Sequence, residues 1–271
     1  MVSDRLKEIL DIAQAAGAAV MEVYQGEEDW EIQQKDDDSP VTKADHAAHQ
    51  VIMAGLSRIT PDTPVISEEG GIVEYSERRG WTEYWLVDPL DGTKEFINRN
   101  GEFTINIALI RNYEPVLGVV FAPALSVSYL AERGEGAWKI DAQGQQTALR
   151  VRPLSTRKVD IVASRRHGGE QLDKLLSRLQ GSIEEVHYVN MGSSLKLCVL
   201  AEGQADWYPR LAPTSEWDTA AAHAVLQEAG GKVVDDGFRP LRYNCKESLL
   251  NPHFHCFADA DYPWQDLLEN I

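Results

Sequence analysis

The sequence is poor in cysteine, and this shortage disfavours two classes of protein. Its three cysteines, Cys198, Cys245 and Cys256, form an odd number and show no CxxC spacing. We therefore expect neither a disulfide framework nor a zinc site built on paired cysteines. Free thiols persist in a reducing compartment, so we expect the protein in the cytoplasm.

Long apolar runs and positive charge are also scarce. No stretch approaches the roughly 18 apolar residues of a membrane-spanning helix, and the first residues lack the apolar core of a secretory signal. The 43 acidic and 26 basic residues give a net charge of −17. This charge repels nucleic acid polymers and anionic membranes, so a small anionic substrate needs local cations. The sequence leaves two properties open. They are the oligomeric state, monomer or homodimer, and a peripheral location at the cytoplasmic face of the inner membrane.

The hydrophobic pattern divides the chain near residue 150. Before that point it predicts two amphipathic helices, over residues 3–24 and after Thr42, followed by a run of antiparallel strands. Beyond it, strand-like segments alternate with helical ones, as in an α/β layer. We therefore expect an α+β domain over residues 1–150 and an α/β domain over residues 151–271.

The richest chemistry lies between residues 85 and 96. An apolar run ends at Asp88 and the chain then turns, which predicts a buried strand closed by a turn. Asp88 and Asp91 are close together, Leu90 between them can offer its backbone carbonyl, and Thr93 adds a hydroxyl. Hard divalent cations such as Mg²⁺ prefer oxygen ligands of these kinds. A solvated Asp-Gly turn is the alternative.

Other acids occupy similar positions. Glu68 follows a predicted strand, and Asp218 begins a predicted helix, where it could simply complement the helix dipole. Asp45 follows Thr42 at the spacing of a capping box, which is its structural alternative. Ligand sites gather where strands end. Carboxylates that converge there without cations either raise their pKa values or bind metal.

A series of short motifs carries a resemblance to a known family. In chain order these are Asp45, Glu68-Glu69, Asp88-Pro-Leu-Asp91-Gly-Thr93, Trp217-Asp218 and Gly230-Gly231. From residue 45 to residue 231 the chain resembles the lithium-sensitive, Mg²⁺-dependent phosphatases of the inositol monophosphatase superfamily. This resemblance implies a layered α-β-α-β-α sandwich. One departure is Ala222, where the family usually has glycine.

Further phrases resemble one branch of that superfamily, the bacterial 3'(2'),5'-bisphosphate nucleotidases. They are Asp38-Ser39-Pro40-Val41-Thr42, Lys94-Glu95-Phe96, Asn100-Gly-Glu-Phe103-Thr and Gly192-Ser193-Ser194-Leu-Lys196. The implied activity is hydrolysis of adenosine 3',5'-bisphosphate to AMP and phosphate, in sulfur assimilation and nucleotide recycling. The sulfated nucleotide PAPS is a related substrate.

The resemblance also implies a set of metal ligands. Glu68, Asp88 and the carbonyl of Leu90 would hold one Mg²⁺. Asp88, Asp91 and Asp218 would hold a second, so that Asp88 bridges the two ions. A third, weaker ion would use Glu68 and water. The expected cofactor is therefore two or three Mg²⁺ ions.

Roles in catalysis and substrate binding follow from the same resemblance. Thr93, oriented by Asp45, would position the attacking water, with Glu68 as the third catalytic residue. The backbone amides of Gly92 and Thr93 would hold the scissile phosphate. The expected substrate contacts are Glu68, Leu90, Asp91, Gly92, Thr93, Asp218, Ser193, Lys196, Arg210 and His167.

The nucleotide contacts have simpler alternatives. Lys196 and Arg210 could meet a second phosphate, Arg210 through a bidentate fork. Ser193 and Ser194 could add donors at a helix start, and His167 could contact sugar or base. Each could instead be a surface charge or a helix cap.

Other functions also remain possible from sequence. An inositol monophosphatase or a sugar bisphosphatase would keep the reaction and change the substrate. A non-catalytic Ca²⁺-binding protein is more distant, because the Asp88–Gly92 stretch lacks the alternating ligands and the terminal Glu of an EF-hand loop. An acidic interaction protein would need neither Thr93 nor the separate Asp218.

Overall fold

The computed structural model describes residues 2–26, 33–34, 40–71, 73–155, 157–163, 172, 175–176 and 183–269. His167 and most of the helix expected over residues 170–179 lie outside the described residues.

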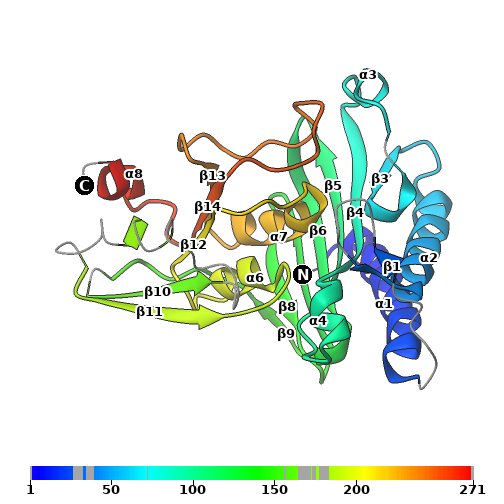
Figure 1. The fold of residues 1–271 in the computed structure, drawn as a ribbon, viewed down its shortest axis with the longest axis horizontal. Coiled ribbons are helices and arrows are strands. Elements are labelled where there is room, and N and C mark those ends of the chain that lie inside the picture. The colour runs from blue at the N-terminus through cyan, green and yellow to red at the C-terminus, as the bar shows by residue number, and fades with distance from the viewer. Residues whose placement is uncertain are drawn as a thin grey trace.

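Helices and sheets alternate in five layers, which Figure 1 shows from right to left. Helices α1 (Asp4–Gln25) and α2 (Lys43–Ile59) pack on one face of a seven-stranded sheet. Helices α6 (Leu195–Ala201) and α7 (Trp217–Glu228) lie between this sheet and a five-stranded sheet. Helix α8 (Trp264–Glu269) packs on the far face of the second sheet. The predicted α-β-α-β-α sandwich is confirmed.

The first two helices begin where the sequence predicts. Ser3 caps α1, because its side chain accepts a hydrogen bond from the backbone N–H of Leu6. Thr42 and Asp45 form a complete capping box at the start of α2. None of the helices in the described part of the chain combines the length and the apolar character needed to span a membrane.

The seven-stranded sheet has the order β3-β4-β5-β6-β7-β8-β9. Its strands after β4 are antiparallel, as expected, while β3 runs parallel to β4. The bounds are β3 Val65–Ser67, β4 Glu83–Asp91, β5 Thr104–Arg111, β6 Glu114–Ala122, β7 Val127–Glu132, β8 Gly136–Ile140 and β9 Gln146–Ala148. Two residues each of β1 (Gln33–Gln34) and β2 (Pro40–Val41) pair separately.

One expectation for this sheet was wrong. Strand β4 does not end at Asp88 but continues to Asp91, which pairs with Thr104. The register shifts between Asp88 and Asp91, so the proline and leucine between them are accommodated as an irregularity inside the strand. This bulge re-aims the side chains at the end of β4.

The five-stranded sheet has the order β11-β10-β12-β14-β13. It is mixed, because β10 runs parallel to β11 and β12 whereas β14 is antiparallel to both of its neighbours. The bounds are β10 Lys158–Ala163, β11 Glu185–Asn190, β12 Trp207–Arg210, β13 Lys232–Asp235 and β14 Phe254–Phe257. The expected alternation of strand and helix is present from β11 through α6, β12 and α7 to β13, and β14 is an additional strand.

Several short elements were not predicted. Strand β14 and helices α3 (Tyr75–Arg78), α4 (Thr93–Ile97) and α8 have at most six residues each. Elements of this length show too few repeats for periodicity to reveal them.

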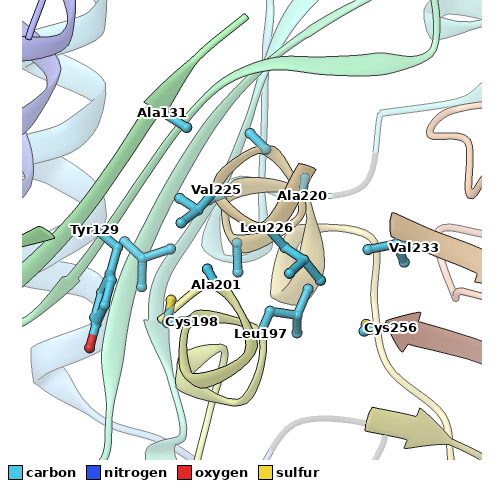
Figure 2. Packing of buried hydrophobic residues seen from close by; sticks show 14 of the residues in the cluster. Tyr129, Ala131, Leu197, Cys198, Ala201, Ala220, Val225, Leu226, Val233 and Cys256 are labelled. Atoms are coloured by element: carbon cyan, nitrogen blue, oxygen red, sulfur yellow. The ribbon is translucent and has the colours of Figure 1, made fainter. Parts of the chain in front are cut away.

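Helix α7 joins the two sheets through one apolar core. Figure 2 shows Ala220, Val225 and Leu226 of α7 between side chains of β7 and of β13 and β14. The helix approaches β6 so closely that a Cβ atom at Gly118 would lie 2.2 Å from the carbonyl oxygen of Ala221. Because this core draws on both sides of residue 150, the division into two domains stays a prediction.

Candidate active site

Three acids from separate elements converge beside the start of α7. Glu68 begins the short 3-10 helix η1 (Glu68–Gly70) after β3, Asp88 lies in the neighbouring strand β4, and Asp218 lies in the first turn of α7. One oxygen from each carboxylate lies within 4.8 Å of the other two. The pairing of Ser67 with Val87 sets the spacing of Glu68 and Asp88.

The environment of these acids disfavours negative charge when no cation is present. Burial, followed by repulsion from Glu68 and Asp91, raises the pKa of Asp88 well above its usual range. Burial and the same two acids also raise the pKa of Asp218. Asp88 Oδ1 accepts a hydrogen bond of 3.0 Å from the N–H of Leu90. Its Oδ2 is buried and has no partner among the described residues.

The residues present fit a hard divalent cation. The donors are carboxylate oxygens, which Mg²⁺ prefers, and a buried oxygen without a partner points to a missing ligand. The carbonyl of Leu90 is nearby in the same bulge, while the Leu90 side chain is buried in the core. Only its backbone is therefore available to a ligand, as expected from the sequence.

Asp91, at the end of β4, has a hydrogen-bond partner outside the acid cluster. Its Oδ2 accepts a hydrogen bond of 2.5 Å from the N–H of Ser194. Burial raises the pKa of Asp91 to about 6, although the nearby cation Lys196 acts in the opposite direction. Asp91 thus links the acid cluster to the segment before α6.

Asp45 uses its two carboxylate oxygens for different purposes. Oδ2 accepts hydrogen bonds of 2.7 Å from both the N–H and the hydroxyl of Thr42, which is the capping role. Oδ1 lies 3.3 Å from the hydroxyl of Thr93, which is also 3.3 Å from the carbonyl oxygen of Leu90. Burial raises the pKa of Asp45 to about 6. The two alternative roles of Asp45 are therefore compatible.

A pocket of about 160 Å³ opens beside Asp91 and Asp218. Three cationic side chains, Lys94, Lys196 and Arg210, line the same pocket. Lys196 donates to the carbonyl oxygen of Ser193 at 2.9 Å, and Arg210 donates to the carbonyl oxygens of Ala212 and Pro213. The lining residues are Asp91, Gly92, Lys94, Glu95, Ser193, Ser194, Lys196, Leu197, Tyr208, Arg210, Thr214, Asp218, Thr219 and Phe254. Acids and cations thus line a single pocket.

Two backbone positions shape this pocket. Gly92 has a φ of +91°, and a Cβ atom there would lie 3.3 Å from the carbonyl oxygen of Glu102. Ser193 also has a positive φ, and its buried Oγ has no partner among the described residues. Ala222 is buried in α7 and is not among the residues that line the pocket.

Sequence reasoning missed a group of polar residues beneath Asp88 and Asp91. Asn106 lies opposite Asp88 in strand β5, and its Oδ1 accepts a hydrogen bond of 2.7 Å from the hydroxyl of Ser194. Thr104 Oγ1 lies 2.8 Å from the same hydroxyl. Both residues interrupt an apolar strand at alternate positions, and this pattern could have identified them.

The sequence matches the model of the inositol monophosphatase family over residues 2–255. It is 50% identical to the 3'(2'),5'-bisphosphate nucleotidase CysQ of Salmonella typhimurium over 249 residues, which are 92% of this chain and 98% of that protein. It is 41% identical to the protein of the same name from Buchnera aphidicola over 255 residues, 93% of each chain.

Solved structures show the same similarity. The crystal structure of CysQ from Bacteroides thetaiotaomicron, described as a bacterial member of the inositol monophosphatase family, has a TM-score of 0.82 and 42% identity, covering 95% of this chain and 97% of that one. The IMPase of Thermotoga maritima has a TM-score of 0.78 at 23% identity, covering 98% of this chain and 96% of that one. The second likeness concerns the fold alone.

Proposed function

The chain belongs to the inositol monophosphatase family of metal-dependent phosphatases, and we propose that it is a Mg²⁺-dependent 3'(2'),5'-bisphosphate nucleotidase. The proposed reaction is hydrolysis of adenosine 3',5'-bisphosphate to AMP and phosphate, with PAPS as a second substrate. The relatives named as nucleotidases, at 50% and 41% identity, support this choice.

One observation carries the proposal. The pocket that Asp91 and Asp218 line is also lined by the cations Lys196 and Arg210, and Asp218 belongs in turn to the trio with Glu68 and Asp88. A substrate with two phosphates matches this arrangement, because a metal can neutralise one phosphate and the two side chains the other. A substrate with a single phosphate would use the metal ligands alone, and Lys196 and Arg210 would bind no phosphate.

Glu68, Asp88 and Asp218 would hold the metal, together with the Leu90 carbonyl and Asp91. Bound there, Mg²⁺ would supply positive charge to the phosphate oxygens and lower the pKa of water. The proposal includes two ions, both of which Asp88 would help to hold. It also includes a third ion, which Glu68 would help to hold. Asp88 Oδ2 is buried and has no hydrogen-bond partner in the described part of the chain, which supports a ligand role for this residue.

Thr93 and Asp45 would position the attacking water. The Thr93 hydroxyl has one hydrogen, and donating it to Asp45 Oδ1 turns the oxygen lone pairs outward. Those lone pairs can accept a hydrogen from water and so orient its oxygen toward phosphorus. Asp45 is in turn fixed by its contacts with Thr42 at the start of α2.

The remaining roles concern the substrate. The amides of Gly92 and Thr93 would hold the scissile phosphate, and Lys196 and Arg210 the second phosphate. Ser193 lines the pocket, and its buried hydroxyl has no hydrogen-bond partner among the described residues. A contact from His167 stays a prediction, as do a cytoplasmic location, a peripheral place at the inner membrane and the oligomeric state.

Phosphate release from a panel of esters tests the proposal. We expect the largest kcat/KM with adenosine 3',5'-bisphosphate, a lower value with PAPS, and little activity on inositol 1-phosphate or fructose 1,6-bisphosphate. Chelation with EDTA should abolish the activity and Mg²⁺ should restore it. A preference for inositol 1-phosphate would replace the nucleotidase assignment with inositol monophosphatase.

A further inference from the structure

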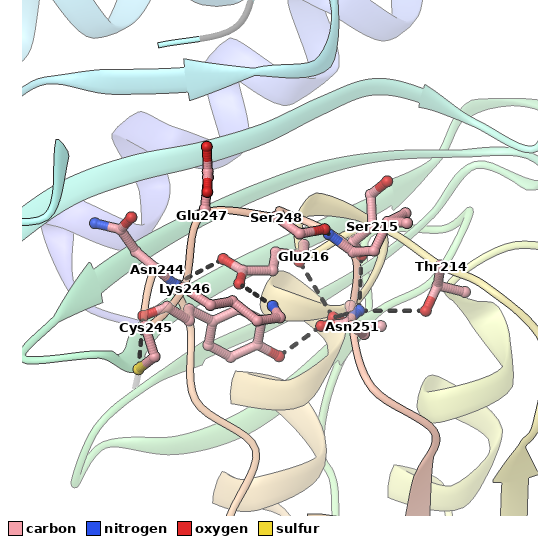
Figure 3. Close-up of polar contacts among 12 residues, drawn as sticks. Thr214, Ser215, Glu216, Asn244, Cys245, Lys246, Glu247, Ser248 and Asn251 are labelled. Atoms are coloured by element: carbon pink, nitrogen blue, oxygen red, sulfur yellow. Dashed lines mark hydrogen bonds and ion pairs between the residues drawn. The ribbon is translucent and has the colours of Figure 1, made fainter. Parts of the chain in front are cut away.

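A fully buried acid lies two residues before Asp218. Glu216 precedes the first residue of α7, and its side chain has no exposed surface. Its carboxylate accepts a hydrogen bond of 2.7 Å from the N–H of Asn244 and one of 3.1 Å from the ammonium group of Lys246. Figure 3 shows these contacts between the start of α7 and the segment of residues 244–251.

The same segment holds a buried arginine from the opposite side. Arg78 ends α3, in the connection between β3 and β4, and is 1% exposed. Its guanidinium donates to Asn244 Oδ1 at 2.5 Å and to the carbonyl oxygens of Val73, Lys246 and Glu247. Asn244 Nδ2 donates back to the carbonyl oxygen of Arg78 at 2.7 Å. Residues 244–247 are therefore tied to the β3–β4 connection.

Asn251, at the other end of the segment, forms hydrogen bonds with residues at the start of α7. Its side-chain amide donates to the carbonyl oxygen of Ser215 at 2.8 Å and to the hydroxyls of Thr214 and Thr219. The N–H of Ser215 donates to Asp218 Oδ2 at 2.8 Å. One hydrogen-bonded path thus runs from the segment to an acid of the cluster.

Strand pairing alone does not explain why Asp218 lies close to Glu68 and Asp88. Register fixes Glu68 against Asp88, because β3 and β4 are neighbours in one sheet. Asp218 comes from a helix in another layer, so no strand register places it. The 244–251 segment contacts both parts, with Arg78 before β4 on one side and Glu216 at the start of α7 on the other.

We propose that Arg78, Asn244 and Glu216 are positioning residues that set Asp218 at metal-binding distance from Glu68 and Asp88. This inference rests on the proposed metal site. The three residues act through the backbone at the start of α7, and none of them is among the residues that line the pocket. Residues that orient metal ligands typically contribute about 10- to 100-fold in metal affinity or activity.

The sharpest test is Asn244→Gly. Asn244 has a φ of +55°, which glycine adopts without strain, and glycine keeps the backbone N–H that Glu216 accepts. The change removes only the two side-chain hydrogen bonds to Arg78. Glu216→Gln is the second variant, because its amide would turn a donor toward either Lys246 or Asn244.

Arg152→Met is the matched control. Arg152 joins Asp160 and Asp206 through hydrogen bonds of 2.6–2.8 Å in the other half of the molecule. Its loss should lower thermal stability without moving a metal ligand. The measurement is Mn²⁺ binding to metal-stripped protein without substrate, by electron paramagnetic resonance of the free ion, together with Tm.

We expect the Kd for Mn²⁺ to rise about 10- to 100-fold in Asn244→Gly and in Glu216→Gln, and to stay unchanged in Arg152→Met at a similar loss of Tm. Unchanged Kd values in the first two variants would overturn the inference and leave the proposed function intact. A wild type that binds no Mn²⁺ would overturn the metal site itself, and the inference with it.

Discussion

Two acids at the start of α7, the buried Glu216 and the partly exposed Asp218, have opposite surroundings. Glu216 lies against Lys246 and near Arg78, and its contacts are hydrogen bonds from neighbouring groups. Asp218 forms a trio with Glu68 and Asp88, and repulsion from Asp91 and Glu68 affects its pKa more than the attraction of Arg210 does. A buried charge is tolerated only when it is paired. The protein neutralises Glu216 from within, whereas the Asp218 group requires a cation from solution.

Asp88→Asn should give the largest effect, because it removes charge from the centre of the unpaired group. The variant should lose several kcal/mol of the stabilisation that bound metal gives to the transition state, and this loss lowers the rate by roughly 10³-fold or more. Without metal, the variant should be more stable than the wild type, since repulsion falls. Glu216→Gln should instead be less stable than the wild type, because its buried partners lose their acceptor.

Phosphate release and Tm in EDTA measure these two outcomes. Asp11→Asn, an exposed acid on α1, serves as the control for a change of net charge. Two results would contradict the contrast between Glu216 and the Asp218 trio. One is near-normal activity of Asp88→Asn at saturating Mg²⁺, and the other is a metal-free Tm of this variant below that of the wild type.

Thr93→Ala should give the next largest effect. The hydroxyl contributes orientation of water and no metal charge, so turnover should fall on the order of 10²-fold while Mn²⁺ affinity stays near the wild-type value. Thr93→Ser keeps the hydroxyl and should recover most of the rate. A loss that added Mg²⁺ restores would mean that Thr93 acts through the metal group instead.

The sequence predicted the acids of the site better than their surroundings. Asp88 follows a recognisable apolar run and Asp218 begins a recognisable helix, and their order along the chain carries the family resemblance. The bulge between Asp88 and Asp91 was missed, because proline in an apolar run also suggests that a strand has ended. The layer order followed from the resemblance rather than from periodicity.

Arg78, Asn244 and Glu216 could not be predicted in the same way. Their contacts join segments 166 and 28 residues apart, and nothing in the local pattern distinguishes Arg78 from the exposed Arg79 beside it. A buried ionic group that depends on long-range contacts leaves no periodic signal. Asn106 differs, since a polar residue inside a buried strand is visible in the sequence.

Asp45 is a third acid to compare with Glu216 and Asp218. Its raised pKa predicts how the stability of the folded protein depends on pH. Its pKa is about 6 in the folded protein against an ordinary 3.8, first because of burial and also because of repulsion from Glu69 and Glu68. The folded state therefore holds this proton more tightly than the unfolded state. Stability falls as pH rises from about 4 to 6, by about 3 kcal/mol in total, and is constant above that range.

The measurement is Tm in EDTA at pH 4.5 and pH 7, for the wild type and Asp45→Asn. Relative to the variant, the wild type should lose roughly 4–8 °C over this interval. Adding Mg²⁺ should shrink the difference, because a cation near Glu68 offsets its repulsion. An equal pH dependence in both proteins would show that Asp45 titrates as an ordinary carboxyl.

Arg210→Ala should give the most selective effect, and on a substrate with a single phosphate the smallest one. Charge-assisted contacts to phosphate are worth roughly 1.5–3 kcal/mol, or about 10- to 150-fold in kcat/KM for adenosine 3',5'-bisphosphate. Adenosine 3'-monophosphate should be hydrolysed almost as before, since its phosphate belongs to the metal side of the pocket. Lys196→Ala should be less selective, because Lys196 also interacts electrostatically with Asp91 and its loss adds one more unneutralised acid to the metal group. The ratio of kcat/KM for the two substrates separates these effects in wild type and in both variants. An equal loss on both substrates in Arg210→Ala would remove this residue from the second-phosphate site and assign it to the metal side.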